Sequence, residues 1–178
     1  DFYHTYPEDF KLMKELGLKA FRTSIAWTRI YPNGDDVLPS EEGLRYYDKM
    51  IDAMIENDIV PVLTLSHFEM PLHLVTEYGG FRNRQVIDFF VKFADTVIRR
   101  YGDRVKYWMT FNEINNQTSW MDPHPMLQNS GLKDYSEDEA QELMYQASHY
   151  ELLASALVTK RAHEIAREKG CELLVGDM

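Results

Sequence analysis

The sequence predicts an α/β fold with a parallel sheet, and three observations lead to this prediction. Segments with helical periodicity alternate with short apolar segments along the 178 residues. A helix separates each predicted strand from the next, as in parallel βα units. Polar side chains interrupt or follow three of the strands, at the edge where parallel sheets bind ligands. Four strands with their helices form either half of an eight-stranded (β/α)8 barrel or a small doubly wound sheet.

The composition excludes several classes of protein. The 19 basic and 29 acidic residues give a formal charge of −10 without any run of Lys or Arg, so neither nucleic acid nor an anionic membrane surface is expected as a partner. No apolar stretch is long enough to span a membrane, and Cys171 has no second cysteine to pair with. We expect one partial, soluble domain over residues 1–178, cut at both ends, because the chain starts at Asp1 and ends in a strand that has just begun.

The first elements follow from apolar spacing. A helix is expected from Thr5 to Leu16, because Phe10 and Met13 recur at helical spacing and Pro7 suits a first turn. A strand is expected over Ala20–Trp27, where the sequence reads AFRTSIAW.

The middle of the chain repeats the pattern twice. A serine cap and two acidic residues introduce a helix over Ser40–Asn57. The β-branched run Ile59–Leu65 predicts the second strand, in which Pro61 removes one ladder donor and counts against a central position. A third amphipathic helix over Asn83–Tyr101 leads into a strand over Tyr107–Phe111.

The last third contains an insertion and one long helix. The prolines, glycine and polar residues of Asn115–Tyr135 indicate a surface loop. Ser136 and Glu139 form a capping-box pair at the start of a helix that runs to Gly170. Cys171 opens the fourth strand.

Four polar residues are the candidate site. Arg22 lies within the first strand, His67 follows the second, and Asn112 and Glu113 follow the third. The carboxyl ends of parallel strands converge, so we expect these side chains to surround one pocket, with Arg22 beneath or beside it. Taken singly, each residue also fits a structural role, in an ion pair or in a solvated loop. Aromatic residues are expected on the pocket walls: Trp27, Phe68, Tyr78, Phe81 and Trp120.

These residue types suit the cleavage of a glycosidic bond. Aromatic rings stack on the C–H faces of a sugar, and polar groups bind its hydroxyls. A protonated Glu113 would serve as general acid, and a second carboxylate is needed about 5–5.5 Å away for a retaining mechanism. Glu69 and Glu77 are the candidates in this segment, although both suit loop roles. The sequence has neither metal-ligand spacing nor a glycine-rich phosphate loop, so no metal or cofactor is expected.

Three motifs resemble those of glycoside hydrolase family 1, the retaining β-glycosidases. They are FRTSIAWTRIYPNG, SHFEMPLHLVTEYGGFRN and YWMTFNEIN, in the family's order and at its intervals. The resemblance implies a (β/α)8 TIM barrel, of which this chain covers about half, from the first helix to the start of the fifth strand. It implies Glu113 as general acid/base, Asn112 as partner of the sugar 2-hydroxyl, and His67 as partner of another hydroxyl. Arg22 would orient the nucleophile and hold it ionised.

The sequences around His67 and Glu113 narrow the resemblance. Phe68–Pro71 and Ile114–Gln117 are similar to bacterial 6-phospho-β-glucosidases, which implies a small-molecule substrate, a 6-phosphorylated disaccharide, and a cytoplasmic enzyme. On this likeness the chain is an N-terminal part that lacks the nucleophile, and the isolated chain is expected to be inactive. The alternatives are a non-phosphorylated β-glucosidase, a non-catalytic sugar-binding or split-barrel fragment, and an unrelated barrel lyase or isomerase with Glu113 as base.

Overall fold

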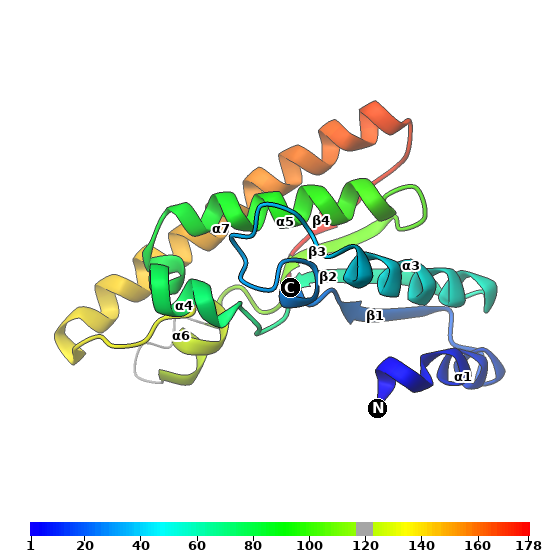
Figure 1. The fold of residues 1–178 in the computed structure, drawn as a ribbon, viewed down its shortest axis with the longest axis horizontal. Helices are drawn as coiled ribbons and strands as arrows, with labels where there is room; N and C mark the ends of the chain where they lie inside the picture. Colours follow the sequence, from blue (N-terminus) through cyan, green and yellow to red (C-terminus); the bar gives the residue numbers. More distant parts are fainter. Residues whose placement is uncertain (117–122) are drawn as a thin grey trace.

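The computed structural model describes residues 1–116 and 123–178, and its framework is one parallel sheet (Figure 1). The four strands lie in the order β1-β2-β3-β4, and every neighbouring pair is parallel. The predicted α/β class with alternating helices and strands is therefore confirmed. The strands are β1 (Ala20–Ser24), β2 (Val60–Ser66), β3 (Tyr107–Phe111) and β4 (Leu174–Gly176).

The second strand is central although it contains Pro61. The N–H of Val60 donates to the carbonyl of Lys19 on the β1 side, so the nitrogen of the next residue faces β3. The β2–β3 ladder begins one residue later, where Val62 pairs with Tyr107. Pro61 therefore takes no hydrogen bond out of either ladder, and its expected cost at a central position does not arise.

Three long helices cover one face of the sheet: α3 (Glu41–Glu56), α5 (Gln85–Tyr101) and α7 (Glu137–Lys169). Figure 1 shows α5 and α7 side by side. The predicted caps are confirmed: the Ser40 hydroxyl accepts from the N–H of Gly43, and Ser136 and Glu139 form the capping box. The core lies between these helices and the sheet, and its largest fully buried side chains include Trp108, Phe90 and Phe93. Apolar burial there holds the strands in register.

The opposite face of the sheet is open in the described structure. Val62, Tyr107, Met109 and Leu174 line a hollow of about 300 Å³ on this side. Tyr107 keeps 39% of its surface exposed. Side chains alternate between the two faces of a strand, so the residues before and after each core position point to this hollow.

The N-terminal helix is longer than its sequence predicts. α1 (Phe2–Glu15) begins three residues before the expected start, so Pro7 lies inside it and not in its first turn. The ring of Phe2 packs edge-on against Phe10 at 5.8 Å, and Phe10 packs against Phe21 of β1 at 5.5 Å. These aromatic contacts add an N-terminal turn that offsets the cost of proline in the helix.

Four short helices are not predicted by periodicity. They are α2 (Trp27–Ile30), α4 (Leu72–Tyr78), the 3₁₀ helix η1 (Gly80–Arg82) and α6 (Pro123–Ser130). Two predictions are corrected as a result: the first strand ends at Ser24 because the chain turns into α2, and the predicted loop 115–135 contains α6. Segments of three to eight residues are too short to show a helical period.

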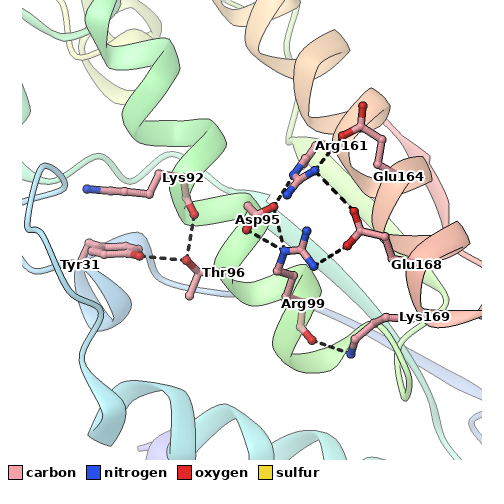
Figure 2. A network of polar contacts seen from close by, with 9 residues as sticks. All are labelled: Tyr31, Lys92, Asp95, Thr96, Arg99, Arg161, Glu164, Glu168 and Lys169. Carbon is pink, nitrogen blue, oxygen red and sulfur yellow. Dashed lines mark hydrogen bonds and ion pairs between the residues drawn. The ribbon is translucent and has the colours of Figure 1, made fainter.

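An ion network joins α5 to α7 on their outer side (Figure 2). Asp95 of α5 accepts from Arg99 of the same helix at 3.1 Å and from Arg161 of α7 at 2.5 Å. Glu168 of α7 in turn accepts from Arg99 at 2.8 Å. The network fixes the relative position of two helices that pack on the sheet.

A helix that spans a membrane has to be both long and apolar. Among residues 1–116 and 123–178, none of the helices meets both requirements.

Candidate functional site

The carboxyl edge of the sheet brings Arg22, Thr64 and Asn112 into contact. Nε of the Arg22 guanidinium donates to the hydroxyl of Thr64 at 3.0 Å, and Nη2 donates to Oδ1 of Asn112 at 2.7 Å. Thr64 is fully buried and Asn112 is 6% exposed. Arg22 pairs with Val62 in the ladder, and Thr64 lies two residues further along β2, so both side chains point to the same face. One guanidinium thus links three strands.

Glu113 follows Asn112 in a left-handed backbone conformation, with φ of 49°. Such a conformation costs a non-glycine residue about 1–3 kcal/mol, so neighbouring contacts must hold it. The N–H of Asn112 donates to Ser66 at the end of β2, and the N–H of Ile114 donates to Met178 beyond β4, at 2.9 and 3.0 Å. The Asn116 side chain donates to the Glu113 carboxylate. The carboxyl group of Glu113 is therefore placed at the edge between two strands.

His67 lines a cavity of about 450 Å³ together with Arg22, Thr23 and Ser24. Burial lowers the pKa of His67, and the positive charge of Arg22 lowers it further, while Glu113 opposes both. The lowered pKa keeps the imidazole neutral at pH 7, with one nitrogen as donor and the other as acceptor. A neutral imidazole can both donate to and accept from a hydroxyl group.

The four predicted site residues are therefore neighbours, but the predicted aromatic wall is wrong at two positions, Trp27 and Phe81. Trp27 is 1% exposed and stacks on Phe93 at 5.5 Å, because α2 turns its ring toward α5. Phe81 is 1% exposed in the same core. Phe68 does lie at the site, with its ring edge-on to His67 at 5.1 Å.

Tyr78 and Trp120 are the remaining two residues predicted to line the pocket. Tyr78 donates its hydroxyl to the Asp35 carboxylate at 3.0 Å and is half-buried on α4. Trp120 lies outside the described residues.

The other carboxylates of the region lie in three different settings. Burial raises the pKa of Glu69 to about 7, with the backbone amides of His67 and Glu69 opposing the shift, and its charge acts on the buried Tyr47. Glu77 is exposed on α4. Asp177, after β4, accepts from the hydroxyls of Thr110 and Ser155, which tie it to the helix side of the sheet.

Sequence reasoning did not single out Glu151, which is completely buried on α7. The hydroxyl of Ser130, at the end of α6, donates to its Oε1 at 2.6 Å. The sequence does hold a signal, because Glu151 is four residues from both Ala147 and Ser155 in the small-residue stripe that packs inward. A charged residue within a buried stripe is unusual enough to indicate a specific role.

No group of three or more His, Cys, Asp or Glu side chains in the described parts of the chain is arranged to hold a metal ion. The site's donors and acceptors are a carboxyl, an amide, an imidazole and a guanidinium. This combination can bind hydroxyls directionally and can move a proton.

Enzymes built on parallel α/β barrels carry their active sites at this carboxyl edge, and the set of polar side chains found here fits an enzyme of that class. The family model described as glycosyl hydrolase family 1 matches residues 1–175, and the chain belongs to this family.

Two bacterial phospho-β-glucosidases are similar to this chain over almost all of its length. It is 55% identical over 168 residues to aryl-phospho-β-D-glucosidase BglA of Bacillus subtilis (strain 168), covering 94% of this chain and 35% of that protein. It is 50% identical over 177 residues to a 6-phospho-β-glucosidase of Clostridium longisporum, covering 98% and 36%. The chain therefore spans about a third of the length of these relatives.

Two solved structures share the fold. The β-glucosidase BglU of Micrococcus antarcticus is 37% identical with a TM-score of 0.81, over 99% of this chain and 34% of that one. The AHE enzyme of Alicyclobacillus herbarius is 31% identical with a TM-score of 0.80, over 99% and 37%. The prediction of a partial TIM barrel is confirmed, and the doubly wound alternative is excluded.

Proposed function

We propose that this chain supplies the acid/base part of a retaining glycosidase site that hydrolyses 6-phosphorylated β-glucosides. The observation that carries the proposal is the placement of Glu113 between two strand ends, beside His67, Asn112 and Arg22. Family membership and identities of 50–55% to proteins named as phospho-β-glucosidases support it.

Glu113 moves the proton. Its protonated carboxyl group donates to the glycosidic oxygen as the C–O bond breaks, and its carboxylate then takes a proton from the water that attacks the glycosyl-enzyme. The Asn116 amide donates to one oxygen of Glu113, which fixes the rotation of the carboxyl group. The left-handed backbone at Glu113 directs the side chain away from the path of the strand.

Asn112 binds the sugar hydroxyl next to the bond that is cleaved. Its Oδ1 accepts from Arg22 at 2.7 Å, which decides the orientation of the amide. The Nδ2 group is left as the donor to the 2-hydroxyl. His67 binds a second hydroxyl as a neutral imidazole.

Arg22 supports a nucleophile that this chain does not contain. A guanidinium near the reaction centre favours the ionised form of a carboxylate and thereby keeps it nucleophilic. Burial raises the pKa of Glu69 to about 7, and Glu77 is exposed on α4, so neither suits the role of an ionised nucleophile in the site. We infer that the nucleophile is supplied by sequence outside residues 1–178, and that the isolated chain has no turnover.

The substrate is a small-molecule phosphoglucoside, and the reaction takes place in the cytoplasm, where phosphorylated disaccharides arise. Identity to phospho-β-glucosidases exceeds the 37% identity to the β-glucosidase BglU. A non-phosphorylated β-glucoside is the second candidate, supported by that similarity.

The test is an exchange of parts. Residues 1–178 replace the matching third of Bacillus subtilis BglA, and the chimaera is assayed on p-nitrophenyl β-glucoside and on its 6-phosphate. The proposal predicts hydrolysis with retained configuration, faster on the phosphate, and no hydrolysis by the isolated chain. An inactive but folded chimaera would contradict the proposed function. Turnover by the isolated chain would contradict the inference that the nucleophile lies outside residues 1–178.

A further inference from the structure

Glu151 is a buried carboxylate that the proposed reaction does not use. It is fully inaccessible on α7, and its Oε1 accepts from the Ser130 hydroxyl, which is also fully buried, at 2.6 Å. A charge in such a place is costly unless it is paired and hydrogen-bonded. The bond joins the middle of the longest helix to the last residue of α6.

The end of α6 is also confined on its other side. Gly80 of η1 has φ of 62°, and a Cβ atom there would lie 2.3 Å from the carbonyl oxygen of Ser130. The backbone of η1 is therefore in direct contact with the end of α6. Glu151 and Gly80 together leave Ser130 and the residue before it little freedom to shift.

That preceding residue, Asn129, reaches the candidate acid. Its Nδ2 donates to the main-chain carbonyl of Glu113 in a long hydrogen bond of 3.5 Å, and Asn129 is 8% exposed. Glu113 is in the strained left-handed region, so contacts to its main chain determine where its carboxyl group points. A continuous path thus runs from Glu151 through Ser130 and Asn129 to Glu113.

We propose that Glu151 is a positioning residue for Glu113, acting through the end of α6. It does not touch substrate, and its carboxylate anchors Ser130 so that Asn129 holds the backbone of Glu113. The proposal rests on the proposed function in one respect, because it takes Glu113 as the acid/base. Sub-ångström placement of such a group strongly affects proton transfer.

The test uses the BglA chimaera and two leaving groups. A phenyl leaving group needs protonation as the bond breaks, whereas 2,4-dinitrophenolate does not. Glu151→Leu keeps the volume but removes the acceptor of Ser130. We expect kcat/KM to fall about tenfold for phenyl β-glucoside 6-phosphate and less than about twofold for the dinitrophenyl compound. Glu151→Gln keeps the acceptor and should restore most of the loss.

Glu142→Leu, on the exposed face of the same helix, is the matched control and should leave both values unchanged. Equal losses for both leaving groups, or no loss, would overturn the proposal. If Glu151→Leu fails to fold, Ser130→Ala breaks the same hydrogen bond at smaller cost and is scored in the same way.

A second readout does not depend on activity. In the isolated chain labelled with ¹⁵N-glutamate, Glu151→Leu should move the amide resonance of Glu113, and Glu142→Leu should not. An unmoved resonance would overturn the positioning role whatever the chimaera does. An inactive parent chimaera with a moved resonance would count against the proposed function alone.

Discussion

Between α5 and α7, Asp95 accepts from two arginines, Arg99 and Arg161, whereas at the carboxyl edge of the sheet a single guanidinium, Arg22, serves both Thr64 and Asn112. The first network is partly exposed, with Arg161 at 35%. The second is buried around Thr64 and Asn112. In the first region Asp95 and Glu168 each have two arginine partners, whereas in the second Thr64 and Asn112 both depend on Arg22.

The difference distinguishes a network that holds two helices together from the cluster at the candidate site. Exposed ion pairs gain little, because water and salt screen them, and alternative partners take over when one is lost. A buried acceptor that loses its donor pays the full cost of desolvation. Single, unshared partners fix one atom in one place, as binding and proton transfer require. The two regions should therefore respond very differently to the loss of a single side chain.

The largest expected effect concerns Glu69, next to the site. Its pKa in the folded state is about 7, above the ordinary value of 4.5, so the folded state holds its proton more tightly than the unfolded state. Stability from this group is complete below about pH 4.5 and is lost as the pH rises to about 7, by roughly 3 kcal/mol at most.

Urea unfolding at pH 5, 6, 7 and 8 measures this dependence. Glu69→Gln should remove it and leave a flatter profile, while Glu77→Gln, on exposed α4, should keep the wild-type slope. Identical slopes for the wild type and Glu69→Gln would show that the carboxyl group is not desolvated.

The next effect concerns the edge cluster itself. Arg22→Met keeps much of the side-chain length but removes the donors to Thr64 and Asn112, so the free energy of unfolding should fall by about 2 kcal/mol. Chemical denaturation of the isolated chain measures it. A loss below about 0.5 kcal/mol would mean that water replaces the guanidinium freely, and the contrast between the two regions would fail.

The smallest effect belongs to the α5–α7 network. Arg161→Met leaves Arg99 in contact with both Asp95 and Glu168, so the melting temperature should drop by about 2 °C or less. The difference should disappear in 0.5 M NaCl, as thermal melts at two salt concentrations would show. A large drop that persists in salt would place this network with the buried one.

The framework of the fold was predictable because its long elements obey simple periods. α3, α5 and α7 carry apolar stripes that face the sheet, and two of them, α3 and α7, begin at the serine caps Ser40 and Ser136. The short helices escaped prediction because tertiary contacts form them. α2 is an example: it has four residues, and Trp27 is placed by its stacking on Phe93.

The candidate site was predictable in part for a related reason. Parallel strands bring their carboxyl ends together, so Arg22, His67, Asn112 and Glu113 were expected to be neighbours from their positions alone. Glu151 is different, because its link to Glu113 passes through α6, a helix that the sequence pattern did not reveal. Contacts made through an unpredicted element are not accessible to reasoning from strand ends.

The most direct test of the central claim is azide rescue of Glu113→Ala in the BglA chimaera. Without its acid/base the enzyme should hydrolyse 2,4-dinitrophenyl β-glucoside 6-phosphate about 10²- to 10⁴-fold more slowly, because water lacks a base. Azide attacks the glycosyl-enzyme without base assistance, so it should restore turnover and give 6-phospho-β-glucosyl azide. A variant that retains its activity, or that loses it without forming this azide, would contradict the assignment of Glu113 as the acid/base.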